Sequence, residues 1–128
     1  MQFRLRTSGE AQEILLELKN ATKITPNILS RYAVALSLKQ EEPLNVIEYD
    51  VAGLEFNRHV LTGNYDSTFK ALISQYENRE LTDEEYFPTN LKLHLERGIR
   101  LLKSEYNYAG NTEKFLINLM NYAKGGTL

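Results

Sequence analysis

The sequence contains no cysteine, which excludes disulfide bonds, thiol chemistry and zinc sites built on thiolates. No apolar run approaches the roughly 20 residues that a membrane-spanning helix needs, so we expect no membrane span. The seven glycines are scattered and form no glycine-rich phosphate-binding loop. What remains is a chain of 128 residues, 42% of them hydrophobic, which predicts a single domain over residues 1–128 and fits a cytoplasmic location.

The charge is unevenly distributed along the chain. The formal net charge is −2, but residues 1–40 carry +3, residues 41–87 carry −8 and residues 88–128 carry +3. An acidic protein can still bind phosphate through a local basic face, so the two basic ends keep nucleic acid among the candidate partners. The alternative is that these charges lie on solvated helix faces of mixed sign.

The first seven residues alternate between apolar and polar side chains, which predicts a short β-strand. Phe3 and Leu5 would face one side, and Gln2, Arg4 and Arg6 the other. The next two segments are helical and offer no partner strand, so we expect the free edge to meet another strand or another chain, with Phe3 and Leu5 in a contact between chains. Two such strands paired across a two-fold axis would present arginine and glutamine to the major groove of DNA.

Two capped helices follow the strand. Thr7 and Glu10 have the spacing of a capping box, so a helix should begin near Gly9. A second helix should begin with Thr25 as its cap and Pro26 as its first residue, and should run to about residue 39. Helical spacing assigns the buried faces to Ala11, Ile14, Leu15 and Leu18 in the first helix and to Ile28, Tyr32, Ala35 and Leu36 in the second.

This strand-helix-helix order over residues 1–40 resembles the ribbon-helix-helix DNA-binding fold. In that fold the second helix directs its N-terminus at a phosphate, which the helix dipole and the free amides favour. Here those amides would come from around Asn27 and Ile28. The alternative is a small helical domain with a frayed N-terminal arm.

The remainder of the chain, residues 41–128, is predicted to be helical, so the fold class is mainly α with one short N-terminal strand. Residues 44–51 are ambiguous between a helical turn, an extended piece and a loop. Caps and apolar spacing predict helices at residues 54–61, from Asp66 onward, at about 89–105 and from Asn111 to Gly125. The inward faces of the last three would be Phe69, Leu72, Ile73 and Tyr76; Leu91, Leu95, Ile99 and Leu102; and Phe115, Leu116, Leu119 and Tyr122.

Two local features of this second half carry specific expectations. Gly98 lies inside the predicted long helix, next to its apolar stripe. A glycine costs roughly 1 kcal/mol in a helix interior relative to alanine, so we expect it to mark close packing against another backbone. Thr82 and Glu85 repeat the capping-box spacing, but Pro88 should cut that helical segment short.

Three stretches of the sequence indicate more than a fold class: ITPNILSRYAVALSL, GLEFNRHVLTGNYDSTFKALI and NLKLHLERGIRLL. They resemble the DndE family of DNA phosphorothioation proteins, and the resemblance runs from about residue 3 to about residue 103. Its strongest parts are the Thr-Pro-Asn helix start, Glu-Phe-Asn-Arg at 55–58 and His-Leu-Glu-Arg-Gly-Ile at 94–99.

The resemblance implies a part in a DNA-modification pathway that replaces a non-bridging phosphate oxygen with sulfur. Members of the family are described as DNA-binding, with a preference for nicked duplex, and as oligomers related to ribbon-helix-helix assemblies, which implies a homodimer or homotetramer here. A nicking activity has also been proposed for some members. The sulfur chemistry belongs to other proteins of the pathway, which would be partners of this chain, and the absence of a cysteine to carry a persulfide agrees with that division.

The candidate DNA-binding residues form two basic sets. The first set comprises Arg4, Arg6, Lys19, Lys23 and Arg31, and the second set comprises Arg97, Arg100 and Lys103. Members of the second set are three positions apart on one predicted helix, so they would make a continuous basic ridge. The competing explanation is pairing within that helix, because Glu96 and Arg100 have the favourable i,i+4 spacing.

The sequence assigns no catalytic residue, no metal ligand and no cofactor. His94 lies at the border of an apolar stripe and is expected to be a structural, hydrogen-bonded histidine, whereas His59 is expected on the surface or in packing. The acidic run Asp83-Glu84-Glu85 is the one dense group of carboxylates that a divalent ion would need. Its place in the first turn of a helix, where acids are favoured by the dipole, is explained by helix capping.

Two alternatives to a DNA-binding accessory protein stay open. The first is a DNA nickase of the same pathway, which would depend on the acidic run or on His59. The second is an interaction module that binds a partner protein and no DNA, because the acidic centre over residues 41–87 repels phosphate and suits a basic surface. Tyr106 and Tyr108 could stack on bases exposed at a nick, but packing is the default role of a tyrosine.

Overall fold

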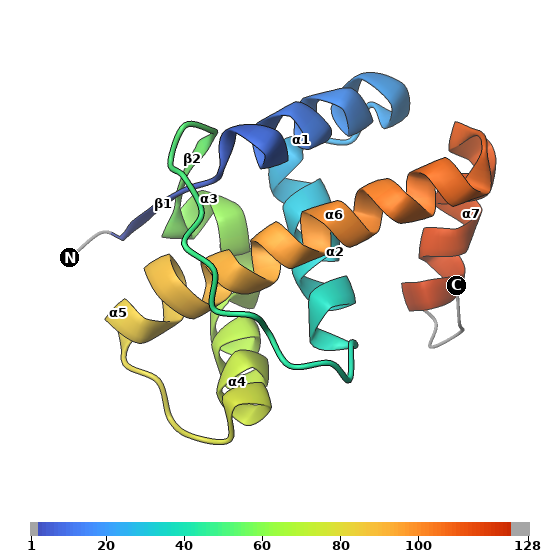
Figure 1. Ribbon diagram of the computed structural model, residues 1–128. Coiled ribbons are helices and arrows are strands. Elements are labelled where there is room, and N and C mark those ends of the chain that lie inside the picture. Colours follow the sequence, from blue (N-terminus) through green and yellow to red (C-terminus); the bar gives the residue numbers. More distant parts are fainter. Residues whose placement is uncertain (1–2, 124–128) are drawn as a thin grey trace.

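The computed structural model describes residues 3–123, and its elements surround one long helix, α6 (Lys92–Ala109) (Figure 1). The chain order is β1 (Arg4–Arg6), α1 (Gly9–Thr22), α2 (Pro26–Leu38), β2 (Glu55–Asn57), α3 (Arg58–Thr62), η1 (Gly63–Tyr65), α4 (Asp66–Glu77), α5 (Asp83–Glu85), η2 (Tyr86–Leu91), α6 and α7 (Thr112–Ala123). The mainly α fold with a short N-terminal strand is therefore confirmed. Among the described residues, no helix combines the length and the apolar character that crossing a membrane requires.

The N-terminal strand has its partner in the same chain. β1 pairs antiparallel with β2, which places Leu5 opposite Phe56. We call this two-stranded pair the hairpin, although α1 and α2 separate its strands in the chain. Both side chains point into the core, and Leu5 is only 2% exposed. The prediction that Leu5 lies in a contact between chains is wrong, because the protein's own core already buries it. Phe3 is half-buried against the same core, and Gln2 lies outside the described residues.

The partner strand lies where the sequence predicts a helix. The apolar pattern predicts helix over residues 54–61, whereas Glu55–Asn57 is extended and the helical segment begins only at Arg58. Pairing with β1 satisfies the backbone of this segment, which removes the need for helical hydrogen bonds there. Asn57 then caps α3, because its side-chain oxygen accepts the amide of Val60 at 2.8 Å.

α1 begins at the predicted residue, but its cap is Ser8 and not Thr7. The Ser8 hydroxyl accepts a hydrogen bond from the Ala11 amide (3.1 Å) and donates one to the Glu96 carboxylate (2.7 Å). The same carboxylate, fully buried on α6, also accepts the amide of Ser8 (2.8 Å). Thr7 cannot cap the helix, because its hydroxyl is hydrogen-bonded to the backbone beside the hairpin.

α2 turns a different face to the core than the apolar pattern predicts. Of the four residues predicted to be buried, only Leu36 is fully buried, and Ile28 is 41% exposed. The buried residues of α2 are Leu29, Ser30, Ala33, Val34, Leu36 and Ser37. α6 approaches this face of α2 closely, so several of the buried residues are small. A prediction based on large apolar side chains therefore misses this face.

The backbones of α2 and α6 are in close contact. A Cβ atom added at Gly98 would lie 1.8 Å from the carbonyl oxygen of Ala33, so no side chain fits at that position. In Figure 1, α6 passes directly across α2. The expectation that Gly98 marks close packing against another backbone is confirmed.

Most of the predicted inward residues of the later helices are buried. These include Leu91, Leu95, Ile99 and Leu102 around α6 and Phe115 and Leu119 on α7. The long helix begins at Lys92 instead of residue 89, because Pro88 lacks the N–H that a regular helical hydrogen bond would need and lies in the π-helical turn η2. On α4, Ile73 is buried but Leu72 is 44% exposed. The side chain of Tyr122 lies outside the described part of the chain.

A buried polar cluster joins α2, α4 and α6. His94 has no exposed surface, its Nδ1 lies 2.8 Å from the Ser37 hydroxyl, and its ring meets that of Tyr76 edge-on at 4.7 Å. Arg97 donates to the same hydroxyl at 2.8 Å, so we assign the hydroxyl proton to the bond with Nδ1 and the ring proton to Nε2. Burial, and then the charge of Arg97, lower the pKa of His94 to about 4. The structural, hydrogen-bonded role predicted for His94 is confirmed.

We expect Gly98→Ala to destabilise the protein. The added methyl group collides with the Ala33 carbonyl and forces α2 and α6 apart, and overpacking of this kind costs about 1–3 kcal/mol of unfolding free energy. Gly9→Ala is the matched control, because a Cβ on that helical glycine meets only an ordinary contact at 3.7 Å, so we expect a change within about 0.5 kcal/mol. Urea denaturation measures both. Equal stability of Gly98→Ala and the wild type would contradict the close contact.

Because His94 is neutral in the folded protein, we expect the free energy of unfolding to fall as the pH is lowered. Its pKa is about 4 in the folded protein against an ordinary value of 6.5, so between these pH values the unfolded chain binds a proton that the native protein does not. Stability therefore falls as the pH drops through this window, by up to about 3 kcal/mol.

Urea denaturation between pH 7 and about pH 4.5 tests this linkage. We expect a weaker pH dependence in His94→Gln and an unchanged one in His59→Gln, whose side chain is exposed. NMR of the folded wild-type protein gives a second measurement. A His94 ring signal that titrates near the ordinary histidine value would refute the prediction.

Candidate nucleic-acid interface

The outer face of the hairpin carries two of the predicted DNA-binding residues. Arg4 and Arg6 point away from the core, with side chains 62% and 51% exposed, because Leu5 between them is directed inward. Both guanidinium groups reach the single carboxylate of Glu55 on β2, at 3.2 and 3.8 Å. One acid faces two arginines, so this surface keeps a net positive charge.

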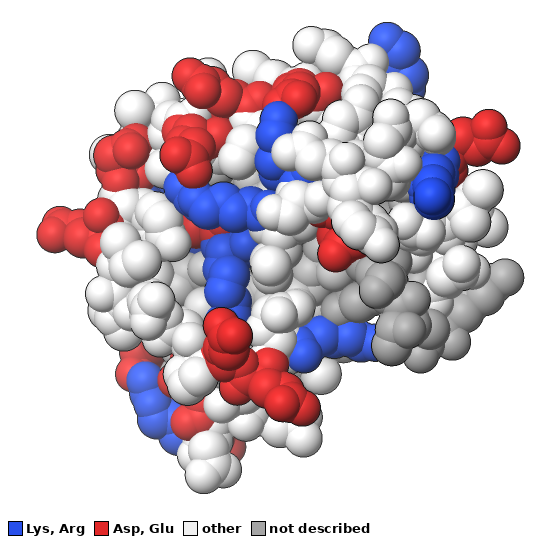
Figure 2. Space-filling model, turned by 45° about the vertical axis from the view of Figure 1, so that its right-hand side comes forward, with Lys and Arg blue, Asp and Glu red and all other residues white. Residues whose placement is uncertain are grey.

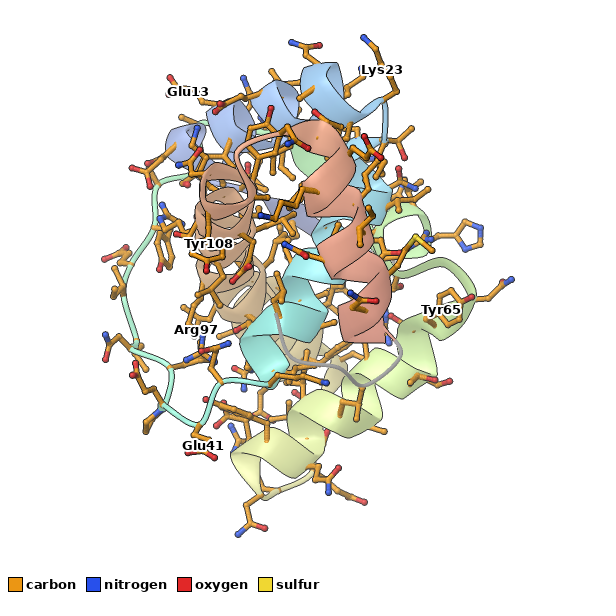
Figure 3. The ribbon with its side chains drawn as sticks, turned by 90° about the vertical axis from the view of Figure 1, so that its right-hand side faces the viewer. Glu13, Lys23, Glu41, Tyr65, Arg97 and Tyr108 are labelled. Atoms are coloured by element: carbon orange, nitrogen blue, oxygen red, sulfur yellow. The ribbon has the colours of Figure 1, made fainter. Side chains whose placement is uncertain are left out.

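A second exposed group lies at the α1–α2 corner, by which we mean Lys19, Lys23 and the first turn of α2. Both lysines are exposed, and neither side chain has an ion pair or hydrogen bond to another residue within 3–123. Lys23 ends α1 in a left-handed conformation (φ 65°), and its amide donates to the Lys19 carbonyl at 2.8 Å. In Figure 3 the Lys23 side chain points away from the body of the protein.

The first turn of α2 lies three residues after Lys23. Thr25 is the cap, but its hydroxyl donates to the side chain of Asn27 at 2.6 Å and accepts no helical amide. Within the described residues, the amides of Asn27 and Ile28 therefore have no acceptor. Free amides at a helix start, together with the helix dipole, favour an anion.

Arg31 is placed differently from the rest of its set. Its half-buried guanidinium donates to the carbonyls of Leu61 (2.8 Å) and Val60 (3.1 Å) and lies against Gly63. These carbonyls belong to the end of α3, where a cation is favourable. Arg31 therefore ties α3 to α2.

Arg97, a member of the second set, is hydrogen-bonded to the C-terminal end of α2. It donates to the carbonyl of Ser37 (2.6 Å) and to the carbonyl of Glu42 (2.8 Å), and its guanidinium lies 5.9 Å from the ring centre of Tyr76. Carbonyls at a helix C-terminus carry partial negative charge. The contacts of Arg97 are therefore those of a helix cap.

The other two members of the second set are paired with acids. Arg100 contacts Glu10 at 2.7 Å and Glu96 at 2.9 Å, and Lys103 pairs with Glu17. The predicted i,i+4 pair of Glu96 and Arg100 is confirmed. On the face drawn in Figure 2, basic side chains accordingly lie among acidic ones and form no continuous basic field.

The sequence reasoning missed a network around Arg58. This guanidinium donates to both carboxylate oxygens of Asp66 at 2.7 to 3.0 Å and contacts Asp83 at 3.1 Å. Asp66 also accepts the hydroxyls of Thr62 (2.9 Å) and Tyr86 (3.0 Å). The hydrogen bond to Asp66 raises the pKa of Arg58 further above its ordinary value. No sequence motif predicts this network, because its members come from separate segments that only folding brings together.

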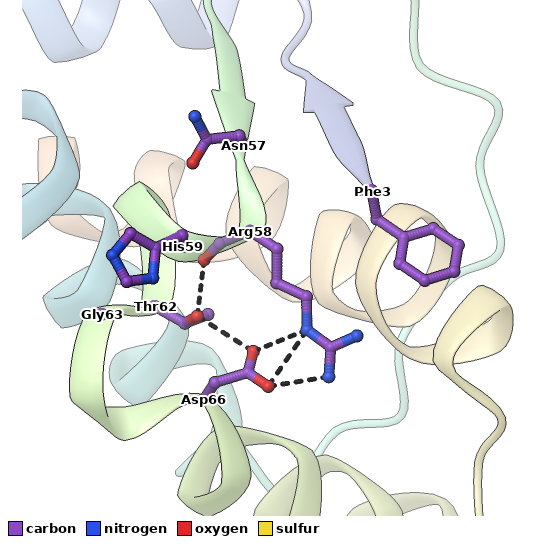
Figure 4. Close-up of a pocket in the computed structure, with 7 residues that line it drawn as sticks. All are labelled: Phe3, Asn57, Arg58, His59, Thr62, Gly63 and Asp66. Atoms are coloured by element: carbon purple, nitrogen blue, oxygen red, sulfur yellow. Dashed lines mark hydrogen bonds and ion pairs between the residues drawn. The ribbon is translucent and has the colours of Figure 1, made fainter. Parts of the chain in front are cut away.

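The network borders a pocket of about 410 Å³ (Figure 4). Its lining residues are Phe3, Asn57, Arg58, His59, Thr62, Gly63 and Asp66. Burial opposes ionisation of Asp66, but hydrogen bonds from Arg58, Thr62 and Tyr86 outweigh it and lower its pKa. The ionised Asp66 neutralises the Arg58 guanidinium, so the two together give this pocket little net charge. In Figure 4, His59 points away from that pair.

The acidic run forms the short helix α5 and is engaged in the fold. Thr82 and Glu85 make the predicted capping box, which is confirmed. Asp83 forms ion pairs with Arg58 (3.1 Å) and Lys70 (2.9 Å). Among the described residues, no three His, Asp or Glu side chains gather into a group that could hold a metal ion.

Other side chains considered for chemistry are divided between the core and the surface. Tyr106 packs edge-on against Phe115 with ring centres 5.3 Å apart, whereas Tyr108 is 82% exposed. The contact of Ser37 with His94 is sealed in the core, so a substrate has no access to it. The exposed groups therefore suit anion binding better than nucleophilic chemistry.

Comparisons with known proteins agree with this architecture. The family model described as DNA sulphur modification protein DndE matches residues 4–110. The chain is similar to the crystal structure of DndE from Escherichia coli B7A, involved in DNA phosphorothioation modification, with a TM-score of 0.64 and 23% identity over 75% of this chain and 93% of that chain. A DndE mutant involved in DNA phosphorothioation gives a TM-score of 0.62 and 23% identity over 79% of this chain and 96% of that chain.

The structural likeness, at this identity, shows a shared fold. No curated protein matches the chain. The family model, by contrast, spans most of the sequence. The chain therefore belongs to the DndE family of DNA sulphur modification proteins.

Proposed function

We propose that this protein is a DNA-binding accessory protein of the phosphorothioation system, which binds duplex DNA, including nicked duplex, through the phosphate backbone. The observation that carries the proposal is the pair Lys19 and Lys23, exposed without an acidic partner beside the open first turn of α2. In this proposal the sulfur chemistry belongs to partner proteins, because the chain has no cysteine. Several copies act together as a homo-oligomer.

The α1–α2 corner supports a phosphate ligand in two ways. Lys19 and Lys23 bring positive charge that no residue of the described protein neutralises. The amides of Asn27 and Ile28 add donors and the positive end of a helix dipole. Membership in a family of DNA sulphur modification proteins supports the DNA backbone as the source of that phosphate.

The hairpin would extend this surface. Arg4 and Arg6 share Glu55, which is itself exposed, and exposed ion pairs contribute little to stability, so a phosphate can replace the carboxylate. The hairpin and the corner lie at opposite ends of α1 (Figure 1). A helix of 14 residues spans about 20 Å, which corresponds to roughly six phosphates along one DNA strand. In the proposed complex, both ends contact the same duplex.

The second basic set supports the proposal less well. Arg97 holds the end of α2, and Arg100 holds the buried carboxylate of Glu96. A phosphate could recruit these side chains only by breaking contacts that stabilise the fold. We therefore assign the phosphate contacts to Arg4, Arg6, Lys19 and Lys23, whereas Arg31 holds α3 against α2.

A surface of this kind predicts weak sequence preference and strong salt dependence. With roughly 4–6 phosphates neutralised per site, the log–log slope of affinity against salt should be about −4 to −5. A nicked duplex bends at little energetic cost. A nick therefore lowers the energetic cost of adjusting the duplex to two separate contact regions.

Charge reversal at the corner should weaken DNA binding. In the double variant Lys19→Glu with Lys23→Glu, we expect a salt slope shallower by about 2, because each lost phosphate contact removes about one unit. Fluorescence anisotropy with intact, nicked and single-stranded DNA at several salt concentrations measures this, with the mass in solution determined alongside. Arg79→Glu is the control, since it changes the charge equally per substitution at an exposed site after α4. An equal loss per substitution in both variants would indicate net charge alone.

Two kinds of substitution in the hairpin are expected to change the affinity for DNA in opposite directions. Arg4→Glu with Arg6→Glu should weaken DNA binding, whereas Glu55→Gln should tighten it several-fold, because it releases both arginines and keeps the size of the side chain. The same anisotropy assay reports both variants, and thermal denaturation checks that they fold. If neither variant changes the affinity, the hairpin is no part of the DNA surface.

A further inference from the structure

The segment between α2 and β2 crosses the molecule as a strap (residues 41–52), outside the helices that it covers (Figure 1). Its first end is tied by the Glu42 carbonyl, which accepts hydrogen bonds from Arg97 and Tyr76, both at 2.8 Å. Its second end is tied by the Asp50 carboxylate, which accepts the amide of Gly9 at 2.9 Å. The strap is therefore held in place at both ends.

Between these ties the backbone of the strap is open. No backbone N–H or C=O of residues 44–49 has a hydrogen bond to any described residue. Leu44 and Tyr49 are half-buried and anchor this run, with the Tyr49 ring 5.0 Å from the guanidinium of Arg100. A run with free amides and carbonyls is the kind of edge with which an added β-strand pairs.

The strap also exposes apolar side chains. Val46 is 91% exposed, and Ile47 and Val51 are at least half exposed. Grooves flank the strap where it crosses α6, one of about 260 Å³ beside Leu101 and one of about 370 Å³ beside Pro88. Apolar side chains gathered on one exposed segment indicate an interaction surface.

The charge of the strap identifies the kind of partner. Its charged residues are four acids, Glu41, Glu42, Glu48 and Asp50, with no Lys or Arg. Of the cations beneath it, Arg100 pairs with Glu10 and Glu96. Lys92 and Arg97 donate to carbonyls of the strap itself, so its four acids outnumber the two cations without a carboxylate partner in the described chain. A second copy would bring the same negative charges, and DNA would be repelled. A basic partner is complementary.

We propose that the strap binds an extended, lysine- or arginine-rich segment of a partner protein, which adds a β-strand along residues 44–49. The backbone of the partner pairs with the open amides and carbonyls. Because side chains of paired strands alternate between two faces, its basic side chains lie on the face of Glu48 and its apolar side chains pack on the opposite face, with Ile47. Because the strap is fixed at both ends beforehand, little conformational entropy is lost on binding. This surface is separate from the α1–α2 corner, so the proposal does not depend on DNA binding.

A defined peptide tests the proposal on the full-length protein. The probe is an octapeptide of alternating lysine and valine with blocked ends, added to isotope-labelled protein and followed by NMR. We expect binding that weakens as salt rises, with slower amide exchange confined to the strap. Glu48→Lys should weaken the binding at least fivefold. Glu13→Lys, a charge reversal at an exposed acid on α1 (Figure 3), should leave it unchanged.

Further peptides separate strand addition from simple charge attraction. The same peptide with alternate amides N-methylated loses half of its backbone donors and should bind at least tenfold more weakly, and a glutamate–valine peptide should not bind. Absence of binding by the lysine–valine peptide, equal weakening by Glu48→Lys and Glu13→Lys, or unchanged binding of the methylated peptide would each overturn the proposal. So would protection of residues 44–49 that grows with protein concentration, because a second copy would then occupy the strap.

Discussion

The arrangement of the helices depends on one place where two backbones touch, at Gly98 of α6 and Ala33 of α2. The two residues that precede Gly98 also make contacts with other elements across this close approach. Glu96 reaches the start of α1, and Arg97 closes the end of α2 and holds the strap. Three consecutive residues of one helix thus position α1, α2 and the long connection after α2. A larger residue in place of Gly98 would shift all three contacts together.

The same contacts decide which cations are left for ligands. Arg97 and Arg100 are on the helix that organises the core, so their charge is absorbed by carbonyls and carboxylates of the protein itself. Lys19 and Lys23 lie at the outer end of α1, where their exposed side chains form no hydrogen bond or ion pair with the described residues. The strap on α6 is acidic and the hairpin is basic. An almost neutral chain therefore has surfaces of opposite sign for different kinds of partner.

Local signals in the sequence predicted local structure well. The starts of α1 and α2, the apolar face of the long helix and the role of Gly98 follow from caps, spacing and helix propensity, all of which act within a few residues. The strand at Glu55–Asn57 did not follow, because its partner lies about fifty residues earlier in the chain. Serines on the buried face of α2 were missed because their burial is set by the approach of α6.

The candidate site shows the same limit. The sequence identifies each basic residue, but whether its charge is free depends on carbonyls and acids brought in from elsewhere, as for Arg97 with Ser37 and for Lys103 with Glu17. The network of Arg58 and Asp66 was invisible for a related reason. Another member, Tyr86, comes from a turn that only the folded chain brings nearby.

The tie between Ser8 and Glu96 also has a consequence for the order in which the protein matures. It joins positions 88 residues apart, and the contact of Ala33 with Gly98 joins positions 65 residues apart. Long-range contacts of this kind slow folding, because the loop must close before they form. A ribosome releases the N-terminus first, so the emerging strand and two helices wait for α6 before their cap and core are complete. Until then the apolar face of α1 is uncovered, and we expect the nascent chain to be a substrate for chaperones.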